Sequence, residues 1–122
     1  MPLLHVLSDK QIKEYEEPPI FSAVQRKHFL RMPLSIQEKV NTLSTTTNKV
    51  GFQLMFGYFL ARKRFYFKEY FHSKDIHFLC KRLGVMPFGF DKTQYRQTTY
   101  TRHRMIILEY FAFQIYQPAL HN

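Results

Sequence analysis

The sequence has little of what several common protein classes need. Its single cysteine, Cys80, excludes an internal disulfide framework and fits a reducing compartment. Four glycines argue against a turn-rich all-β sandwich and against a glycine loop that holds nucleotide phosphates. The longest apolar run spans residues 50–61 and is interrupted by Gln53, whereas a membrane span needs about 20 apolar residues. We therefore expect a cytoplasmic protein that has no membrane partner.

Acidic residues are also scarce, which argues against catalysis. The chain has nine, and no P-loop, G-x-S-x-G or H-E-x-x-H motif. A two-metal nuclease centre needs about three converging carboxylates, but the acids after residue 17 stand singly along the chain. His72, His77 and Cys80 form only a partial ligand set, because structural zinc takes four ligands. We expect no catalytic residue, no metal and no cofactor in this chain.

Positive charge is what the chain has in excess. Lys and Arg number 18, and the formal net charge at pH 7 is +9. Residues 1–17 carry a net charge of −2, whereas residues 18–122 carry +11. Such a basic body favours a polyanionic partner, with nucleic acid first and an anionic membrane surface second. A merely solvated basic surface is the plainer alternative.

Length and local patterning predict a single all-α domain. A chain of 122 residues has room for one core. Four serine or aspartate residues are each followed three positions later by glutamine or glutamate, as in a helix capping box. These pairs are Ser8/Gln11, Ser22/Gln25, Ser35/Glu38 and Asp91/Gln94. We predict a compact bundle of five to seven helices, in which a helix-turn-helix arrangement is one option.

The expected helices cover about residues 9–16, 23–30, 36–43, 48–62, 74–83, 92–97 and 100–110. The segment 48–62 is apolar nearly all round and should be the central helix, with Gly51 and Gly57 at close helix contacts. Residues 65–72 are either extended or a short helical turn. Ser73 and Gly84 are expected to cap and to stop the helix between them.

The domain is expected to cover residues 1–116. Residues 117–122 should form a frayed tail, which suggests a chain cut from something longer.

Basic side chains cluster in three stretches, and these are the candidate DNA contacts. They comprise Arg26, Lys27 and Arg31, then Arg62, Lys63 and Arg64, then Arg96, Arg102, His103 and Arg104. Asn48 and Lys49 stand at a predicted helix start, where a phosphate can bind. Other roles stay open, since Asn48 can simply cap its helix and His103 can pack in the core opposite Ile107.

Several short motifs follow one another in a fixed order and spacing. They are Leu7-Ser8, Pro18-Pro19-Ile20-Phe21-Ser22, Arg26-Lys27 with Phe29, Met32-Pro33, Asn48-Lys49-Val50-Gly51-Phe52, Gly57-Tyr58-Phe59, Arg64-Phe65, Asp75-Ile76, Leu83-Gly84, and Tyr95, Arg96, Thr99, His103 and Ile107. In this order they resemble the N-terminal domain of the large replicative transposases of the Tn-three family, a segment often catalogued as a domain of unknown function. The resemblance covers about residues 4–116.

The resemblance implies an all-helical module that binds double-stranded DNA at the terminal inverted repeats of a bacterial transposon. Its partner would be the remainder of the transposase. It adds Thr99 to the candidate DNA-binding residues and marks Asn48, Lys49, Arg96 and His103 as motif positions. The carboxylate triad of these transposases lies in a part that this sequence does not contain, so no catalytic residue is carried over.

One position departs from the family pattern, and two other functions stay open. Ala112 stands where the family commonly turns with glycine, which would let the last helix run on. The first alternative is a helical protein–protein interaction module within the transposase. The second is a truncated, free-standing regulator that occupies the transposon ends. The oligomeric state is open in each case.

Overall fold

The computed structural model describes the backbone of residues 17–120 and side chains up to residue 113. Within that range the chain forms five α-helices and two short 3-10 helices, and it has no strand. They are α3 (Ala23–Phe29), α4 (Leu34–Thr42), α5 (Thr46–Arg62), η1 (Lys68–Tyr70), α6 (Ser73–Leu83), η2 (Lys92–Gln94) and α7 (Gln97–Leu120). The all-α prediction is confirmed. The helix predicted over residues 9–16, with its Ser8 capping pair, lies outside the described residues.

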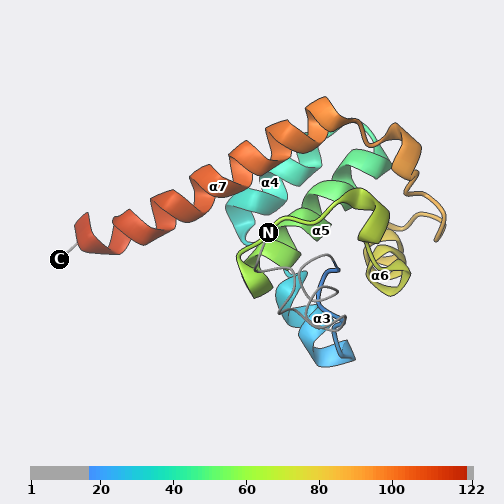
Figure 1. The fold of residues 1–122 in the computed structure, drawn as a ribbon, viewed down its shortest axis with the longest axis horizontal. Coiled ribbons are helices and arrows are strands. Elements are labelled where there is room, and N and C mark those ends of the chain that lie inside the picture. Colours follow the sequence, from blue (N-terminus) through green and yellow to red (C-terminus); the bar gives the residue numbers. More distant parts are fainter. Residues whose placement is uncertain (1–16, 121–122) are drawn as a thin grey trace, which may run out of the picture.

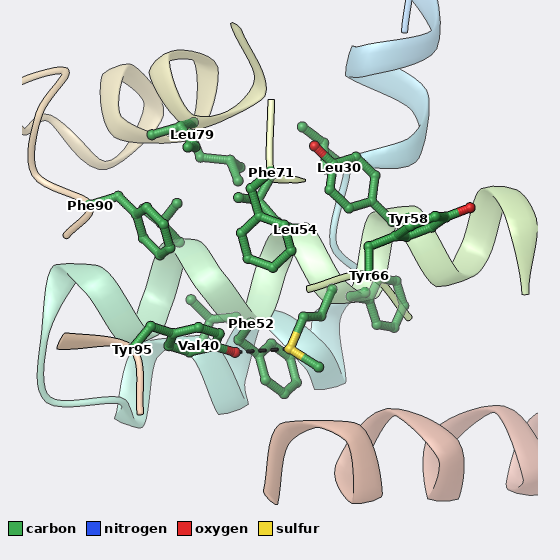
Figure 2. Close-up of a cluster of buried hydrophobic side chains, with 14 of the residues drawn as sticks. Leu30, Val40, Phe52, Leu54, Tyr58, Tyr66, Phe71, Leu79, Phe90 and Tyr95 are labelled. Atoms are coloured by element: carbon green, nitrogen blue, oxygen red, sulfur yellow. Dashed lines mark hydrogen bonds between the residues drawn. The ribbon is translucent and has the colours of Figure 1, made fainter. Parts of the chain in front are cut away.

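Helix α5 forms the centre of the molecule, as its apolar sequence predicts. Every residue from 50 to 58 is buried, and α3, α4, α6 and α7 all pack against this helix (Figure 1). Buried side chains around it include Leu30, which directly follows α3, Val40 of α4 and Leu79 of α6 (Figure 2). A helix covered on all sides has no solvent face to keep polar, and this explains the lack of amphipathic patterning in α5.

The two glycines of α5 mark close contacts, again as predicted. A Cβ atom on Gly51 would come within 2.6 Å of the Tyr95 ring. On Gly57 it would collide with the Leu30 side chain and approach the Phe29 carbonyl oxygen to 2.9 Å. Both positions need the absence of a side chain rather than backbone freedom, because neither has a positive φ.

Two of the predicted helix ends are confirmed in detail. The Ser22 hydroxyl accepts from the Gln25 amide at 3.2 Å, and the Gln25 side chain accepts from the Ser22 amide at 2.9 Å, which completes the capping box of α3. Gly84 ends α6 in the left-handed conformation with φ of 74°. Both signals operate within a few residues, so tertiary packing does not override them.

Other predicted helix starts are wrong. Helix α4 begins directly after Pro33, whose fixed φ favours a helix start there, and this leaves Ser35 inside the helix rather than at its cap. Helix α5 is capped by Thr45, whose hydroxyl accepts from the Asn48 amide at 3.0 Å, so the helix begins at Thr46, two residues before its predicted range, and Asn48 is no cap. Helix α6 already includes Ser73, and the residue before it, His72, provides no side-chain cap.

The region after α6 also differs from the prediction. Asp91 caps η2 through the Thr93 amide at 2.9 Å and does not form a box with Gln94. The helix predicted over residues 92–97 is only the short turn η2. Residues 65–72, expected to be either extended or a short helical turn, contain the short helical turn η1.

The last helix is far longer than its predicted range of 100–110. Helix α7 runs from Gln97 to Leu120, past residue 117 where a tail was expected, and its final part extends beyond the other helices (Figure 1). Ala112 lies inside it at the position where the resembled family commonly has glycine. Alanine has the highest helix propensity, so nothing at this position stops the helix.

Candidate nucleic-acid interface

A polar hollow of about 430 Å³ lies where α5 and α7 begin. It is lined by Thr45, Asn48, Thr93, Gln94, Arg96 and Thr99. Thr45 is the N-cap of α5, and Asn48 is the third residue of that helix. Arg96 directly precedes α7, and Thr99 is the third residue of α7. The hollow therefore lies between two helix N-termini.

The electrostatics of this hollow favour an anion. Each helix N-terminus carries about half a positive charge, because its first amide groups have no partner within the helix. Arg96 is exposed and adds a full positive charge, and none of the six lining side chains is acidic. Phosphate and carboxylate groups bind at such helix starts.

Asp91 is the acid next to the hollow in the chain. Its Oδ1 accepts from the Thr93 hydroxyl at 2.6 Å and from the Thr93 amide at 2.9 Å. These bonds, with the hydroxyl as the larger cause, hold the pKa of Asp91 below its ordinary value. The carboxylate is thus ionised near neutral pH and orients one residue that lines the hollow.

A basic ridge begins beside the hollow. We give this name to Arg64, Lys68 and Arg104, which gather where residues 64–68 run back along the first turns of α7. The Arg104 guanidinium lies 5.2 Å from the centre of the Phe65 ring, and Arg64 lies 5.6 Å from that of Tyr66. Lys68 donates to the Tyr95 carbonyl at 2.8 Å, one residue before Arg96. Lys68 therefore ties residues 64–68 to the chain just before Arg96, and Arg104 places the ridge on α7.

Three candidates from the sequence, Asn48, Arg96 and Thr99, meet in the hollow. Lys49 follows Asn48 in the chain and is half-buried, but it does not line the hollow. Sequence reasoning missed Thr45, Thr93 and Gln94 as lining residues and Lys68 as part of the ridge. Only the polar character of residues 44–47 and the overall positive charge hinted at them.

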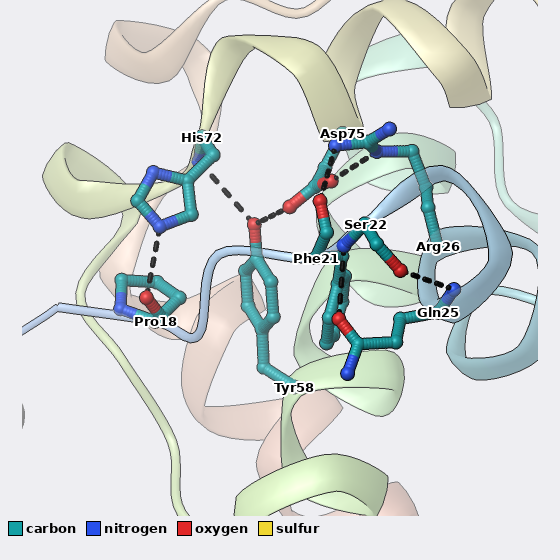
Figure 3. Close-up of polar contacts among 8 residues, drawn as sticks. All are labelled: Pro18, Phe21, Ser22, Gln25, Arg26, Tyr58, His72 and Asp75. Carbon is teal, nitrogen blue, oxygen red and sulfur yellow. Dashed lines mark hydrogen bonds and ion pairs between the residues drawn. The ribbon is translucent and has the colours of Figure 1, made fainter.

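Arg26, one of the candidate DNA contacts, forms a partly buried ion pair. Its Nε donates to Asp75 Oδ1 at 2.7 Å, and its second guanidinium nitrogen donates to the Phe21 carbonyl at 3.0 Å (Figure 3). Asp75 is only 1% exposed and also accepts from the Tyr58 hydroxyl at 2.6 Å. Burial, followed by the charge of Asp75, raises the pKa of Tyr58 far above its usual range. The guanidinium balances a buried charge, which gives Arg26 a structural role, and its contact with DNA stays a prediction.

His103, another candidate, lies in the core. The side chain is 2% exposed, and the edge of its ring meets the Phe52 ring at a centroid distance of 4.9 Å. Burial, helped by the charge of Arg102, lowers the pKa of His103 to about 4. A neutral, buried imidazole cannot contact a phosphate, and the core-packing alternative for His103 holds.

The remaining candidates lie away from the hollow. Arg62 and Lys63 are at the opposite end of α5, about 25 Å along a helix of 17 residues. Lys63 also has a structural role, because it ends α5 in the left-handed conformation and its Nζ lies 5.1 Å from the centre of the Phe111 ring. The side chains of Lys27, Arg31 and Arg102 are exposed, and their contact with DNA stays a prediction.

Metal ligands and membrane-spanning helices were also considered for the described part of the chain. No group of three or more His, Cys, Asp or Glu residues there could hold a metal ion. The His72 ring nitrogen Nε2 lies 2.8 Å from the Pro18 carbonyl oxygen, and Cys80 is buried in the core. None of the helices described has the length and apolarity that crossing a membrane requires.

Comparison with known proteins gives one match. A family model described as a domain of unknown function, DUF4158, matches residues 6–120. No curated protein and no solved structure matches the chain.

Proposed function

We propose that this chain, which belongs to the DUF4158 family of domains of unknown function, is a module that binds double-stranded DNA. The observation that carries the proposal is the polar hollow, which brings Asn48, Arg96 and Thr99 together at two helix N-termini. Asn48 stands more than 45 positions before Arg96 and Thr99 in the sequence. The fold brings the three residues together around a space that favours an anion. The net charge of +11 over residues 18–122 gives the same preference to the whole body.

In this proposal a backbone phosphate occupies the hollow. Arg96 supplies the charge, and the side-chain amide of Asn48 and the hydroxyl of Thr99 supply hydrogen bonds. The basic ridge follows the backbone away from that phosphate, with Arg64 and Arg104 stacked on aromatic rings that hold their guanidinium groups in place. Such contacts fix the position of a protein on the duplex but do not read its sequence.

The finer proposal is that the module belongs to a transposase. The resemblance to the N-terminal domain of the Tn-three family replicative transposases supports it, since three of the six residues that line the hollow, Asn48, Arg96 and Thr99, are motif positions of that resemblance. The module would then hold the terminal inverted repeats of the element, and the remainder of the transposase would cut and join them. Catalysis is not assigned to this chain.

A titration against duplex DNA at several salt concentrations tests the proposal. Each phosphate contact contributes about −0.9 to the slope of log affinity against log salt. Arg96→Ala should therefore make the slope shallower by about 0.9, because it removes one phosphate contact. The matched control is Lys74→Ala, which removes an exposed charge at the start of α6, outside the hollow. An equal effect of the two variants, or a parent chain without salt-dependent binding, would overturn the proposal.

A second function, that of a protein interaction module, is favoured by one observation. Helix α7 has apolar side chains on the side that faces away from the body as well as on the packed side. Met105 is 55% exposed, Leu108 is 42% exposed and Phe113 is 58% exposed. Ile107 on the packed side is fully buried. Replacing Leu108 with Ser should leave DNA affinity unchanged under the first proposal and abolish binding to the remainder of the protein under the second.

A further inference from the structure

The loop between α6 and η2 ends in an exposed apolar tip. Met86, Pro87 and Phe88 are consecutive and exposed, with Met86 61% and Phe88 77% accessible to solvent. The Gly89 amide donates to the Met86 carbonyl at 2.9 Å, which closes a tight turn over Pro87 and Phe88. Single apolar residues on a surface need no explanation, but three in succession at the tip of a turn indicate a contact.

This tip is held rigidly against the first turn of α5. The Thr47 hydroxyl donates to the Gly89 carbonyl at 3.4 Å and accepts from the Asp91 amide at 3.1 Å. Gly89 is closely packed, because a Cβ atom there would lie 3.1 Å from the Met86 carbonyl oxygen and 3.2 Å from the Thr46 methyl group. Pro87 fixes its own φ and stiffens the turn further. The tip therefore keeps its position relative to the start of α5.

The start of α5 is also one wall of the polar hollow. Thr45 and Asn48 line the hollow, and Thr46 and Thr47, which lie between them in the chain, contact the tip through Gly89. On the other side, Thr93 and Gln94 line the hollow a few residues after the tip. The polar hollow and the apolar tip thus both contact the first helical turn of α5.

We propose that Phe88, supported by Met86, inserts between two stacked base pairs of duplex DNA when a phosphate occupies the hollow. The inference rests on the proposed DNA-binding function and specifies how the duplex is held. Duplex DNA presents a phosphate and a stack of planar apolar bases side by side, which matches the hollow and the tip together. An acidic protein surface would satisfy the hollow but offers no such stack. Phe and Met are among the side chains that proteins insert between base steps.

Insertion has a geometric consequence for the DNA. An apolar side chain that enters a base step partly unstacks it and kinks the duplex by about 20–90°. The chain should therefore bend DNA, and Phe88 should be responsible for the bend. The phosphate contacts of the hollow and the ridge should not depend on Phe88.

The experiment measures bending and affinity on the same complex. The probe is a duplex of about 25 base pairs with a fluorescent donor at one end and an acceptor at the other, because a kink shortens the distance between the ends. The proteins are the full chain, Phe88→Ser, and the control Leu34→Ser, which replaces a side chain that is 76% exposed at the start of α4. Energy transfer is recorded at saturating protein, and affinity is recorded across several salt concentrations.

We expect the parent chain and Leu34→Ser to raise energy transfer equally. Phe88→Ser should bind about tenfold more weakly, because one base–aromatic contact is lost, and should leave energy transfer at the value of free DNA. Its salt slope should equal that of the parent. A parent chain that binds without bending, or a Phe88→Ser variant that bends as much as the parent, overturns this inference and leaves DNA binding intact. Absence of salt-dependent binding by the parent overturns the proposed function itself.

Discussion

The hydroxyl oxygen of Tyr95 lies 2.6 Å from Nδ1 of His103 inside the core. Tyr95 comes from the segment between η2 and α7, and its ring covers Gly51 of the central helix. The same hydroxyl lies 2.9 Å from the Met55 sulfur, as Figure 2 shows. The contacts of Tyr95 with Met55 and Gly51 hold this segment against α5. Because Arg96 follows Tyr95 directly, they also hold Arg96 near the start of α7, where it lines the hollow.

The first prediction concerns pH. The pKa of His103 is lowered from 6.5 to about 4 in the folded protein by burial, so between these values the unfolded chain binds the proton more tightly. Stability should therefore be complete above about pH 6.5 and fall as the pH drops toward 4, by up to about 1.4 kcal/mol per pH unit. Urea unfolding across this range measures the effect.

His103→Gln serves as the comparison for that prediction. Glutamine keeps a polar side chain near Tyr95 but does not titrate. The variant should be less stable near neutral pH and should lose less stability on acidification than the parent. An identical loss in both proteins would show that other groups cause the pH dependence.

The second prediction concerns Gly51. Alanine normally stabilises a helix interior by about 1 kcal/mol over glycine, but here its Cβ would lie 2.6 Å from the Tyr95 ring. We expect Gly51→Ala to destabilise the protein by about 1–3 kcal/mol, the range for an overpacked core. Tyr95→Leu in the same chain should recover part of that loss, because leucine lacks the ring atoms that collide. A stable single variant would mean that the contact is looser than described.

The third prediction concerns the end of α5. Lys63 has a φ of 58°, a conformation that favours glycine. Lys63→Gly should raise stability by about 0.5–1 kcal/mol, since the strain removed exceeds the lost contact with Phe111. Lys63→Ala keeps the strain and loses the contact, so its urea midpoint should fall. The prediction is wrong if both variants shift the midpoint in the same direction.

The fourth prediction separates two neighbouring basic residues on α3. Arg26→Ala leaves Asp75 buried without its ion pair, so the free energy of unfolding should fall by about 3–5 kcal/mol. The adjacent Lys27 is exposed, and Lys27→Ala should change stability by less than about 0.5 kcal/mol. Thermal unfolding of both variants tests this, and a small effect of Arg26→Ala would contradict its structural role.

The fifth prediction concerns sequence reading by α7. Arg102 is exposed, whereas the guanidinium of Arg104 lies over Phe65 as part of the basic ridge. Arg102→Ala should weaken the free energy of binding to a duplex with the terminal inverted repeat by about 1–3 kcal/mol. The loss on a scrambled duplex should be much smaller. Arg104→Ala should weaken both duplexes alike, because a phosphate contact does not discriminate. Equal losses on both duplexes for Arg102→Ala would exclude it as a reading residue.

Much of the fold could be predicted from the sequence because the signals are local. The capping box of Ser22 and Gln25 involves atoms three residues apart, and the buried stripe of Ile76 and Leu79 follows from helical periodicity alone. The apolar character of residues 50–58 likewise identified α5 as the central helix. Errors arose where two local signals compete, as at Thr45 and Asn48, since either side chain can cap a helix.

Which basic side chains are engaged inside the fold was decided only by the tertiary structure. Arg26 and Lys27 are equivalent in the sequence, yet Arg26 meets Asp75, which lies 49 residues further along the chain. The hollow forms because packing of α7 against α5 brings Arg96 and Thr99 to the start of α5. Capping and periodicity act over three or four residues, whereas these contacts depend on how whole helices pack. The sequence therefore determined the helices and the charge of this protein, and the packing determined which charges stay buried and which residues form a site.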